Sequence, residues 1–251
     1  MKSKETIKNS NFGFLEVEAE EKPKLVNEVF DNVAENYDLM NDLLSFGAHR
    51  LWKRIAVELS SVREDFKILD LAGGTGDLTK LLSSKINKNG QLILSDFNKN
   101  MLLEGRNRLI DSGINNVSYA QINAQNLPFK PESFNLITIA FGLRNFTDKN
   151  LALKEIYNCL KSGGSLMVLE FSKPENEILR ELYDLYSFEI MPIIGSLVAK
   201  SSESYSYLAE SIRMHPGQEE LKEMLEGAGF SKCNYENLTN GIVAIHRGIK
   251  K

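Results

Sequence analysis

The sequence predicts an α/β protein with a doubly wound, mostly parallel sheet. Short apolar runs of strand length alternate with segments of helical spacing between residues 67 and 170, as in parallel sheets covered by helices. The run at 67–71 passes into a glycine-rich turn and then an amphipathic pattern, which indicates a strand, a tight turn and a helix start. With 251 residues, 42% of them apolar, the chain can bury one large core, and its length allows one domain or two.

The elements follow in order along the chain. Residues 1–23 are polar and charged and predict a flexible tail, whose few apolar side chains would fold over something apolar. Helical spacing over 24–60 predicts a helical cover that precedes the main domain, 61–251. Strands are expected at 67–71, 91–95, 117–122, 136–141 and 166–169, and helices at 98–112 and 151–160, the second closed by a turn at 161–164.

The alternation stops after Glu170. We expect a helical insertion over 171–217, in which the helix 178–199 carries an aromatic and aliphatic stripe. A helix at 218–228 ends at Gly229, and two closing strands, 231–238 and 242–246, form a hairpin.

The turn after the first strand favours a particular cofactor. Its third motif glycine is replaced by Thr79 and no Lys-Ser/Thr follows, so neither a dinucleotide motif nor a P-loop is complete. Asp70 and Asp77 flank the turn, and two carboxylates would repel a pyrophosphate but suit a cation. S-adenosylmethionine carries an ammonium, a sulfonium and no phosphate. A ligand role is favoured for Asp70; for Asp77 it weighs equally with a carboxylate that stabilises the helix dipole. The turn glycines, Gly73 among them, would let the backbone approach the ligand closely.

Three further strand ends carry candidate site residues. Asp96 follows the second strand at the usual distance from the glycine turn for a ribose acceptor, although it could instead cap the next helix. Asn123 ends the third strand and suits an adenine edge, the alternative being a turn asparagine. Arg144 and Asn145 follow the fourth strand and could orient an acidic oxygen, or be a solvated arginine and a helix-capping asparagine.

Composition narrows the function classes. A net charge of −4 argues against a nucleic-acid-coating surface. Cys159 and Cys233 are far apart, with no Cys/His cluster, so we expect neither disulfide nor metal site and a reducing compartment. The start lacks an apolar leader, and the longest apolar stretch, 190–199, is about half of the ~20 residues that a spanning helix needs. A cytoplasmic protein, soluble or peripheral at the inner membrane face, is therefore expected.

Three blocks carry a resemblance to a known family. They are Tyr37-Asp38-x-Met40-Asn41-x-x-Leu44-Ser45-x-x-x-His49-x-x-Trp52, then Phe141-Gly142-Leu143-Arg144-Asn145, and a tyrosine-bearing block at 205–216. The chain resembles the ubiquinone/menaquinone biosynthesis C-methyltransferases, class I enzymes that methylate a ring carbon of a polyprenyl benzoquinol or of demethylmenaquinol. The match runs from about Phe12 to Lys250 with spacing preserved.

The resemblance implies a Rossmann-like sheet of seven strands and the cofactor S-adenosyl-L-methionine, released as S-adenosyl-L-homocysteine. The family's cofactor positions fall on Thr75, Asp96, Asn123 and Ala124. A serine found in some members at the end of the fourth strand falls on Ala140, so that side-chain contact is lost. A second departure is Ser162, where a proline is usual; it alters the stiffness of a turn rather than chemistry.

The chemistry of such a methylation needs an electron-rich ring carbon. Removing the quinol hydroxyl proton supplies it, and a phenol with a pKa of ~10 needs a cation or a base for this. We expect Arg144 to stabilise the phenolate, and Asn145 with a water to relay the proton, since arginine is a poor base. Secondary candidates, each equally interpretable as structural, are Tyr205, Tyr207, Arg213 and His215.

The expected partners are a polyprenyl quinol and a membrane surface that the chain contacts without spanning, and not nucleic acid. A homo-oligomer and membership of a quinone-synthesis complex stay open. Two other functions also stay open: an O-methyltransferase of a small phenol, and a non-catalytic S-adenosylmethionine-binding subunit. The intact glycine turn and the Arg144-Asn145 pair argue against the second.

Overall fold

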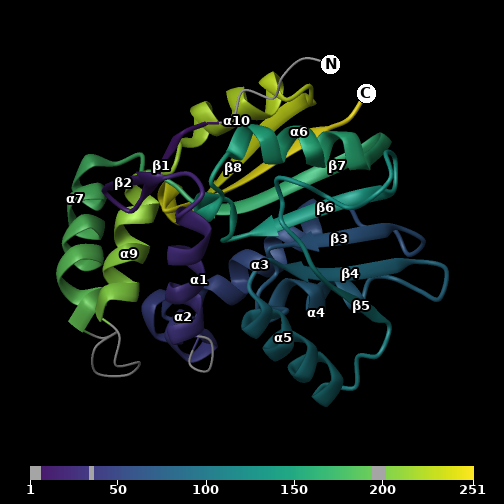
Figure 1. Ribbon diagram of the computed structural model, residues 1–251, viewed down its shortest axis with the longest axis horizontal. Coiled ribbons are helices and arrows are strands. Elements are labelled where there is room, and N and C mark those ends of the chain that lie inside the picture. Colours follow the sequence, from purple (N-terminus) through teal and green to yellow (C-terminus); the bar gives the residue numbers. More distant parts are fainter. Residues whose placement is uncertain (1–6, 34–36, 194–201) are drawn as a thin grey trace.

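A computed structural model describes residues 7–33, 37–193 and 202–251 (Figure 1). Its main sheet has seven strands in the order β5-β4-β3-β6-β7-β9-β8. Strand β9 runs antiparallel to both of its neighbours, and the other neighbouring pairs are parallel. The predicted doubly wound, mostly parallel sheet is confirmed. The strands are β3 (Lys67–Leu71), β4 (Gln91–Asp96), β5 (Val117–Gln121), β6 (Phe134–Ala140), β7 (Leu160–Phe171), β8 (Ser231–Leu238) and β9 (Val243–Ile249).

Helices cover both faces of this sheet, which is why most residues of its central strands are apolar and buried. On one face lie α3 (Ala48–Leu59), α4 (Asp77–Ser83) and α5 (Lys99–Asp111), and on the other α6 (Lys149–Cys159) and α10 (Gln218–Gly227) (Figure 1). Each face has its own core: Ile68 of β3 packs with Trp52 and Leu78, whereas Leu69 packs with residues such as Ile156 and Leu221. Neighbouring residues of one strand thus serve opposite cores.

The remaining helices gather to one side of the sheet, beyond the carboxyl ends of its parallel strands (Figure 1). They are α1 (Lys22–Val33), α2 (Tyr37–Ser45), α7 (Glu177–Leu185), the π-helical turn η3 (Tyr186–Ile190) and α9 (Ser202–Arg213). Helices α1, α2 and α3 thus fall almost wholly within the predicted cover 24–60, and α7, η3 and α9 within the predicted insertion 171–217. The two units and their limits stay a prediction. Residues 194–199 of the predicted helix 178–199 lie outside the described residues.

The predicted tail differs from the structure. Residues 9–18 form an antiparallel hairpin of β1 (Asn9–Phe12) and β2 (Leu15–Glu18), with Gly13 at a positive φ of 59° in the turn. The Phe12 ring stacks on Tyr207 of α9 at 4.3 Å between ring centroids, and the Ser10 hydroxyl donates to the Thr147 carbonyl at 3.1 Å. The hairpin forms because it has this aromatic surface to pack on.

The predicted turn at 161–164 also differs, because it lies within β7. Helix α6 ends at Cys159, and Leu160 already pairs with Phe134 of β6. The backbone N–H of Gly163 donates to the Lys250 carbonyl at 2.9 Å, so residues just beyond β9 also hold this stretch. The predicted closing hairpin is confirmed as β8 and β9, joined by the short helix η4 (Thr239–Gly241).

Candidate functional site

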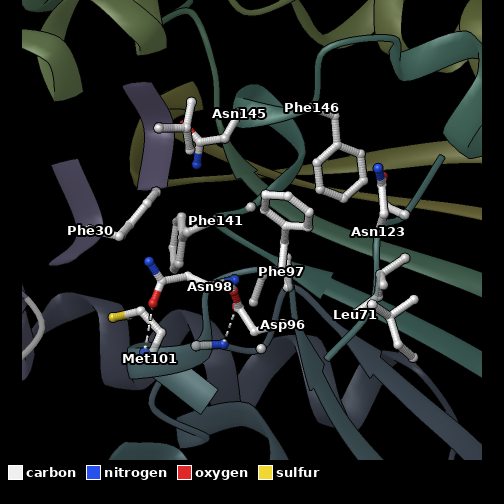
Figure 2. Close-up of a pocket in the computed structure, with 18 of the residues that line it drawn as sticks. Phe30, Leu71, Asp96, Phe97, Asn98, Met101, Asn123, Phe141, Asn145 and Phe146 are labelled. Carbon is white, nitrogen blue, oxygen red and sulfur yellow. Dashed lines mark hydrogen bonds between the residues drawn. The ribbon is translucent and has the colours of Figure 1, made fainter. Parts of the chain in front are cut away.

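A cavity lies over the glycine turn, where the carboxyl ends of β3, β4, β5 and β6 meet (Figure 2). Parallel strands end at one edge of a sheet, so residues far apart in sequence are brought together here. Figure 2 shows Asp96, Asn98 and Met101 on one side of the cavity and Asn123 and Phe146 on the other. Of the residues predicted to bind cofactor, those that line it are Gly73, Thr75, Asp96, Asn123, Ala124 and Ala140.

The glycine turn is held tightly from behind. Gly74 adopts a φ of 55°, and its N–H donates to Asp96 at 2.9 Å, while the Gly73 N–H donates to the Ser95 carbonyl at 2.9 Å. Gly105 of α5 lies against the turn: a Cβ atom there would be 2.6 Å from the Gly74 carbonyl oxygen. Close approach of α5 therefore needs glycine at position 105.

Asp96 is oriented by two backbone hydrogen bonds. Its second carboxylate oxygen accepts from the Asn98 N–H at 2.8 Å. Asn98, not Asp96, caps α5, because its side-chain oxygen accepts from the Met101 N–H at 2.8 Å. The competing interpretation of Asp96 as the helix cap is thereby removed. Burial raises the pKa of Asp96 to about 6, against the opposing effect of these backbone donors.

Asp70 does not line the cavity, so the predicted ligand role does not fit the geometry. It is fully buried, and its two carboxylate oxygens accept from the hydroxyls of Thr79 at 2.6 Å and Thr138 at 2.8 Å. Its carboxylate lies directly beneath Gly73, where an added Cβ would meet it at 2.9 Å. Asp70 thus ties β3 to α4 and β6 and supports the turn from inside.

Asp77 does line the cavity, at the first position of α4. It accepts from Lys53 of α3 at 2.8 Å and from Arg108 of α5 at 3.1 Å. Burial disfavours its ionisation, but these cations hold the pKa of Asp77 below its usual range. Asp77 therefore combines the two roles that the sequence left equal: a carboxylate at a helix N-terminus, and one that faces the cavity.

A second cavity, of about 260 Å³, adjoins the first. It is lined mainly by apolar and aromatic side chains that come from both parts of the helical cover, among them Val29, Leu44, Trp52, Tyr183, Tyr186, Tyr205 and Leu208. Phe30 of α1 and Phe141 after β6 line both cavities. The two spaces thus meet at these two rings, which Figure 2 shows among the residues that line the first cavity.

Arg144 and Asn145, adjacent in the short helix η2 (Leu143–Asn145), face different cavities. Arg144 lines the apolar cavity, and Asn145 lines the cavity over the glycine turn. The Arg144 guanidinium is 4% exposed, donates to Glu170 at 2.9 Å and to the Phe141 carbonyl, and lies 5.5 Å from the Phe171 ring centroid. The Tyr207 hydroxyl donates to Asn145 at 3.0 Å. Arg144 is therefore not the solvated arginine of the alternative interpretation.

The secondary candidates separate into two groups. Tyr205 and Tyr207 line the apolar cavity. Arg213 instead pairs with Asp184 and lies 5.7 Å from the Phe188 ring centroid, so it holds the insertion together. His215 is buried, lines neither of these two cavities, and has its pKa lowered well below the usual value by that burial.

Four charged or titratable residues at the site were not predicted as functional: Asp42, His49, Lys53 and Glu170. In the sequence, His49 stands out only as part of the segment 37–52 that resembles the family. Its contact with Asp42 forms because the turn between α2 and α3 brings the two residues together. Glu170 is the last residue but one of the buried strand β7, and only its ion pair with Arg144 marks it as part of the site. Within the described parts of the chain, no three His, Cys, Asp or Glu residues are grouped to hold a metal.

Comparison with protein families identifies one family. Residues 16–250 match the model of the ubiE/COQ5 methyltransferase family. The chain is 57% identical, over 96% of its length and 98% of the relative's, to the ubiquinone/menaquinone biosynthesis C-methyltransferase UbiE of Methylococcus capsulatus. It is 54% identical to UbiE of Shewanella halifaxensis over 99% of both chains.

Solved structures agree on the fold. A S-adenosylmethionine-dependent methyltransferase from Thermotoga maritima, a possible histamine N-methyltransferase, superposes with a TM-score of 0.63 at 22% identity, covering 89% of this chain and all of that one. Phosphoethanolamine N-methyltransferase 2 of Haemonchus contortus, solved with S-adenosyl-L-methionine, gives a TM-score of 0.60 at 15% identity over 79% of this chain and 52% of that one. At these identities the likeness concerns the fold alone.

Proposed function

Since this chain belongs to the ubiE/COQ5 methyltransferase family, we propose a place for each of the two reactants of its reaction. The chain is an S-adenosylmethionine-dependent enzyme that C-methylates a polyprenyl quinol in ubiquinone/menaquinone biosynthesis. The cofactor binds over the glycine turn, and the quinol ring binds in the apolar cavity. The observation that carries this assignment is the junction at Phe30 and Phe141, which line both cavities.

The residues around the glycine turn suit the cofactor. The Asp96 carboxylate, held by two N–H groups, would accept from the ribose hydroxyls. Asn123 accepts from the Gln125 N–H at 2.9 Å, which orients its NH₂ group as a donor for an adenine ring nitrogen. Gly73, Thr75 and Ala124 complete the wall, to which Ala140 brings only a methyl group. When bound, S-adenosylmethionine supplies a methyl group activated by its sulfonium.

The residues around the apolar cavity suit a quinol that must lose a proton. Arg144 places a buried positive charge beside the ring, which favours a phenolate oxygen and so an electron-rich ring carbon. Its pairing with Glu170 fixes the guanidinium and leaves the pair neutral overall. Asn145, linked to Tyr207, can hold a water between the two cavities. Aromatic walls exclude bulk water and position the ring for the transfer.

A labelled-methyl experiment tests this function. The protein is incubated with ¹³C-methyl S-adenosylmethionine and a short-chain demethylmenaquinol or benzoquinol, either reduced or oxidised, and the product is examined by NMR. We expect label at a ring-methyl position, and only with the reduced ring, because only the quinol has a hydroxyl proton to lose. Label on oxygen would favour the O-methyltransferase, and cofactor binding without transfer would favour the non-catalytic subunit.

Asp96→Ala should weaken cofactor binding while leaving the fold intact. The substitution removes hydrogen bonds to a charged acceptor. Losing such a bond costs ~1.5 to 3 kcal/mol, which is roughly tenfold or more in affinity. Calorimetric titration with S-adenosylhomocysteine measures the effect, and circular dichroism checks the fold. An unchanged dissociation constant would refute the ribose assignment.

A membrane surface is the proposed source of the quinol. On α7, Ile178, Leu182 and Leu185 share one helix face and are 70%, 58% and 57% exposed, and Phe46, just beyond α2, is 87% exposed. The Phe46 ring lies 6.3 Å from that of Tyr186, which directly follows α7, and both rings line the apolar cavity. A prenyl tail gains ~0.8 kcal/mol per buried CH₂, so the ring must be met at a lipid interface or on a carrier. Along the described stretches, no helix is both long and apolar enough to cross a membrane.

Liposomes test this surface. We expect hydrogen exchange in α2 and α7 to slow when liposomes containing the quinol are added, because their exposed apolar side chains enter the lipid. Leu182→Asn should reduce vesicle binding without changing cofactor affinity, whereas Leu103→Asn, at a 40% exposed leucine on α5, should not. Unchanged hydrogen exchange in both helices, with normal activity in detergent-free solution, would refute the proposed membrane surface.

A further inference from the structure

His49 is a buried histidine whose two ring nitrogens have different surroundings. It lies in the first turn of α3, is 5% exposed and lines the apolar cavity. Its Nε2 atom is 2.7 Å from an oxygen of Asp42 in α2. Its Nδ1 atom has no hydrogen-bond partner among residues 7–33, 37–193 and 202–251; Asp77, at the edge of the cofactor cavity, is 4.0 Å away. One ring nitrogen is thus anchored by Asp42, and the other, Nδ1, is the nitrogen of this cavity-lining ring that remains to form a hydrogen bond.

The charges around the ring fix its tautomer. Burial opposes ionisation of Asp42, but hydrogen bonds from Arg50 and His49 lower its pKa, so Asp42 is a carboxylate at neutral pH. A carboxylate accepts, so Nε2 carries the hydrogen and the lone pair is on Nδ1. Burial and Lys53 lower the pKa of His49 despite the opposing pull of Asp42 and Asp77, so the imidazole is neutral and able to accept a proton.

Other groups at the cavity are less suited to accept a proton. Arginine stays protonated, which excludes Arg144. The hydroxyls of Tyr186 and Tyr207 already donate to the Leu44 carbonyl and to Asn145. Burial raises the pKa of Tyr183 to about 12, so its phenol holds its own proton at neutral pH. The charged groups that face the ring are Asp42 from α2, Arg50 and Lys53 from α3 and Asp77 from α4.

We propose that His49, oriented by Asp42, is the general base that accepts the proton released by the quinol. The inference rests on the function proposed above. The quinol O–H bond breaks, its electron pair stays on the oxygen, and the proton passes to Nδ1. After methylation, the hydrogen on the methylated ring carbon leaves as a proton and aromaticity returns. The oxygen regains one proton, so one is released per turnover. Asp42 and Asp77 stabilise the imidazolium. The Asp42 side chain is 29% exposed, so this end of the pair is in contact with solvent.

His49→Gln tests the base. Glutamine can still donate to Asp42 but cannot take up a proton, so single-turnover methyl transfer to a short-chain quinol, at saturating cofactor, should fall by about 10²- to 10⁴-fold. In the wild type, the rate of methyl transfer should fall at acidic pH because His49 becomes protonated. In His49→Gln this acidic limb of the pH–rate profile should disappear. Cofactor affinity should stay unchanged, and imidazole in solution should restore part of the rate of His49→Ala. His246→Gln, at a buried histidine that lines neither cavity, should keep the wild-type profile.

Asp42→Asn provides a second, independent test should a His49 variant fold poorly. The amide oxygen can still accept from Nε2, but the negative charge is gone, so the acidic limb should move to lower pH and turnover should fall. A wild-type protein that methylates the quinol while His49→Gln stays within about threefold of it, with the same acidic limb, would overturn the base assignment and leave the function standing. An unmoved limb in Asp42→Asn would also overturn it. Failure of the wild type to methylate any quinol would instead refute the proposed function.

Discussion

Replacing Arg144 by alanine is expected to lower turnover by about two to three orders of magnitude and to destabilise the fold as well. The rate falls because the buried positive charge beside the quinol oxygen is lost. Stability falls because Glu170, 1% exposed, is left buried without its partner, which costs ~3 to 5 kcal/mol. Cofactor affinity should change little, since Asp96 and the glycine turn are intact. Arg144→Lys should recover only part of the rate, because a point charge does not reproduce the planar fork.

A double substitution separates these two effects. Replacing both partners, Arg144→Met with Glu170→Leu, removes the buried pair without leaving a lone charge, and such replacements are often neutral for stability. We expect thermal stability to return toward that of the wild type while methyl transfer stays low. Wild-type turnover in this variant would make Arg144 a structural residue only. Poor cofactor binding with normal turnover at saturation would assign it to the cofactor site.

Gly105→Ala is expected to weaken cofactor binding by about 5- to 100-fold although Gly105 does not line the cofactor cavity. The added methyl would lie 2.6 Å from the Gly74 carbonyl and 3.1 Å from the carbonyl carbon of Thr75. Because these are backbone atoms, the glycine turn must shift, and overpacking of this kind costs ~1 to 3 kcal/mol. Alanine otherwise favours a helix over glycine, so lower stability would itself show the collision.

Gly227→Ala is the matched control for that substitution. It is also a helical glycine, at the end of α10, and a Cβ atom there would have nothing within 4 Å. Cofactor affinity should stay at the wild-type value, with stability unchanged or slightly higher. Calorimetry with S-adenosylhomocysteine compares the two variants. Equal affinities in Gly105→Ala and the wild type would show that α5 does not hold the turn.

Local pattern was enough to predict the sheet and several of the residues that line the cavity over the glycine turn. The strands are short apolar runs, and the candidate residues stand at the strand ends, so sequence order alone brings Asp96 and Asn123 to one edge. Ala140 was indicated only by the family resemblance. The same logic misplaced Asp70, because whether a strand-end carboxylate faces a ligand or the interior depends on Thr79 and Thr138, which pattern does not link to it.

Features that depend on packing between distant segments were not predictable in this way. The N-terminal hairpin forms against Tyr207, nearly 200 residues along the chain, and a polar tail gives little local sign of it. The buried pair of Arg144 with Glu170, and the contact of His49 with Asp42 and Asp77, likewise arise only when separate elements meet. These tertiary contacts involve both of the charged or titratable side chains, Arg144 and His49, to which a role in the apolar cavity is assigned above.

The location of the quinol is tested most directly by the fluorescence of Trp52. It is the single tryptophan of the chain, lines the apolar cavity and lies 6.3 Å from Phe141 between ring centroids. An oxidised short-chain quinone, which quenches indole emission on contact, is titrated into the protein bound to S-adenosylhomocysteine. We predict saturable quenching over the concentration range in which the reduced form is methylated. Unquenched Trp52 emission at quinone concentrations where methyl transfer to the quinol is already half-maximal would contradict the assignment of the ring to this cavity.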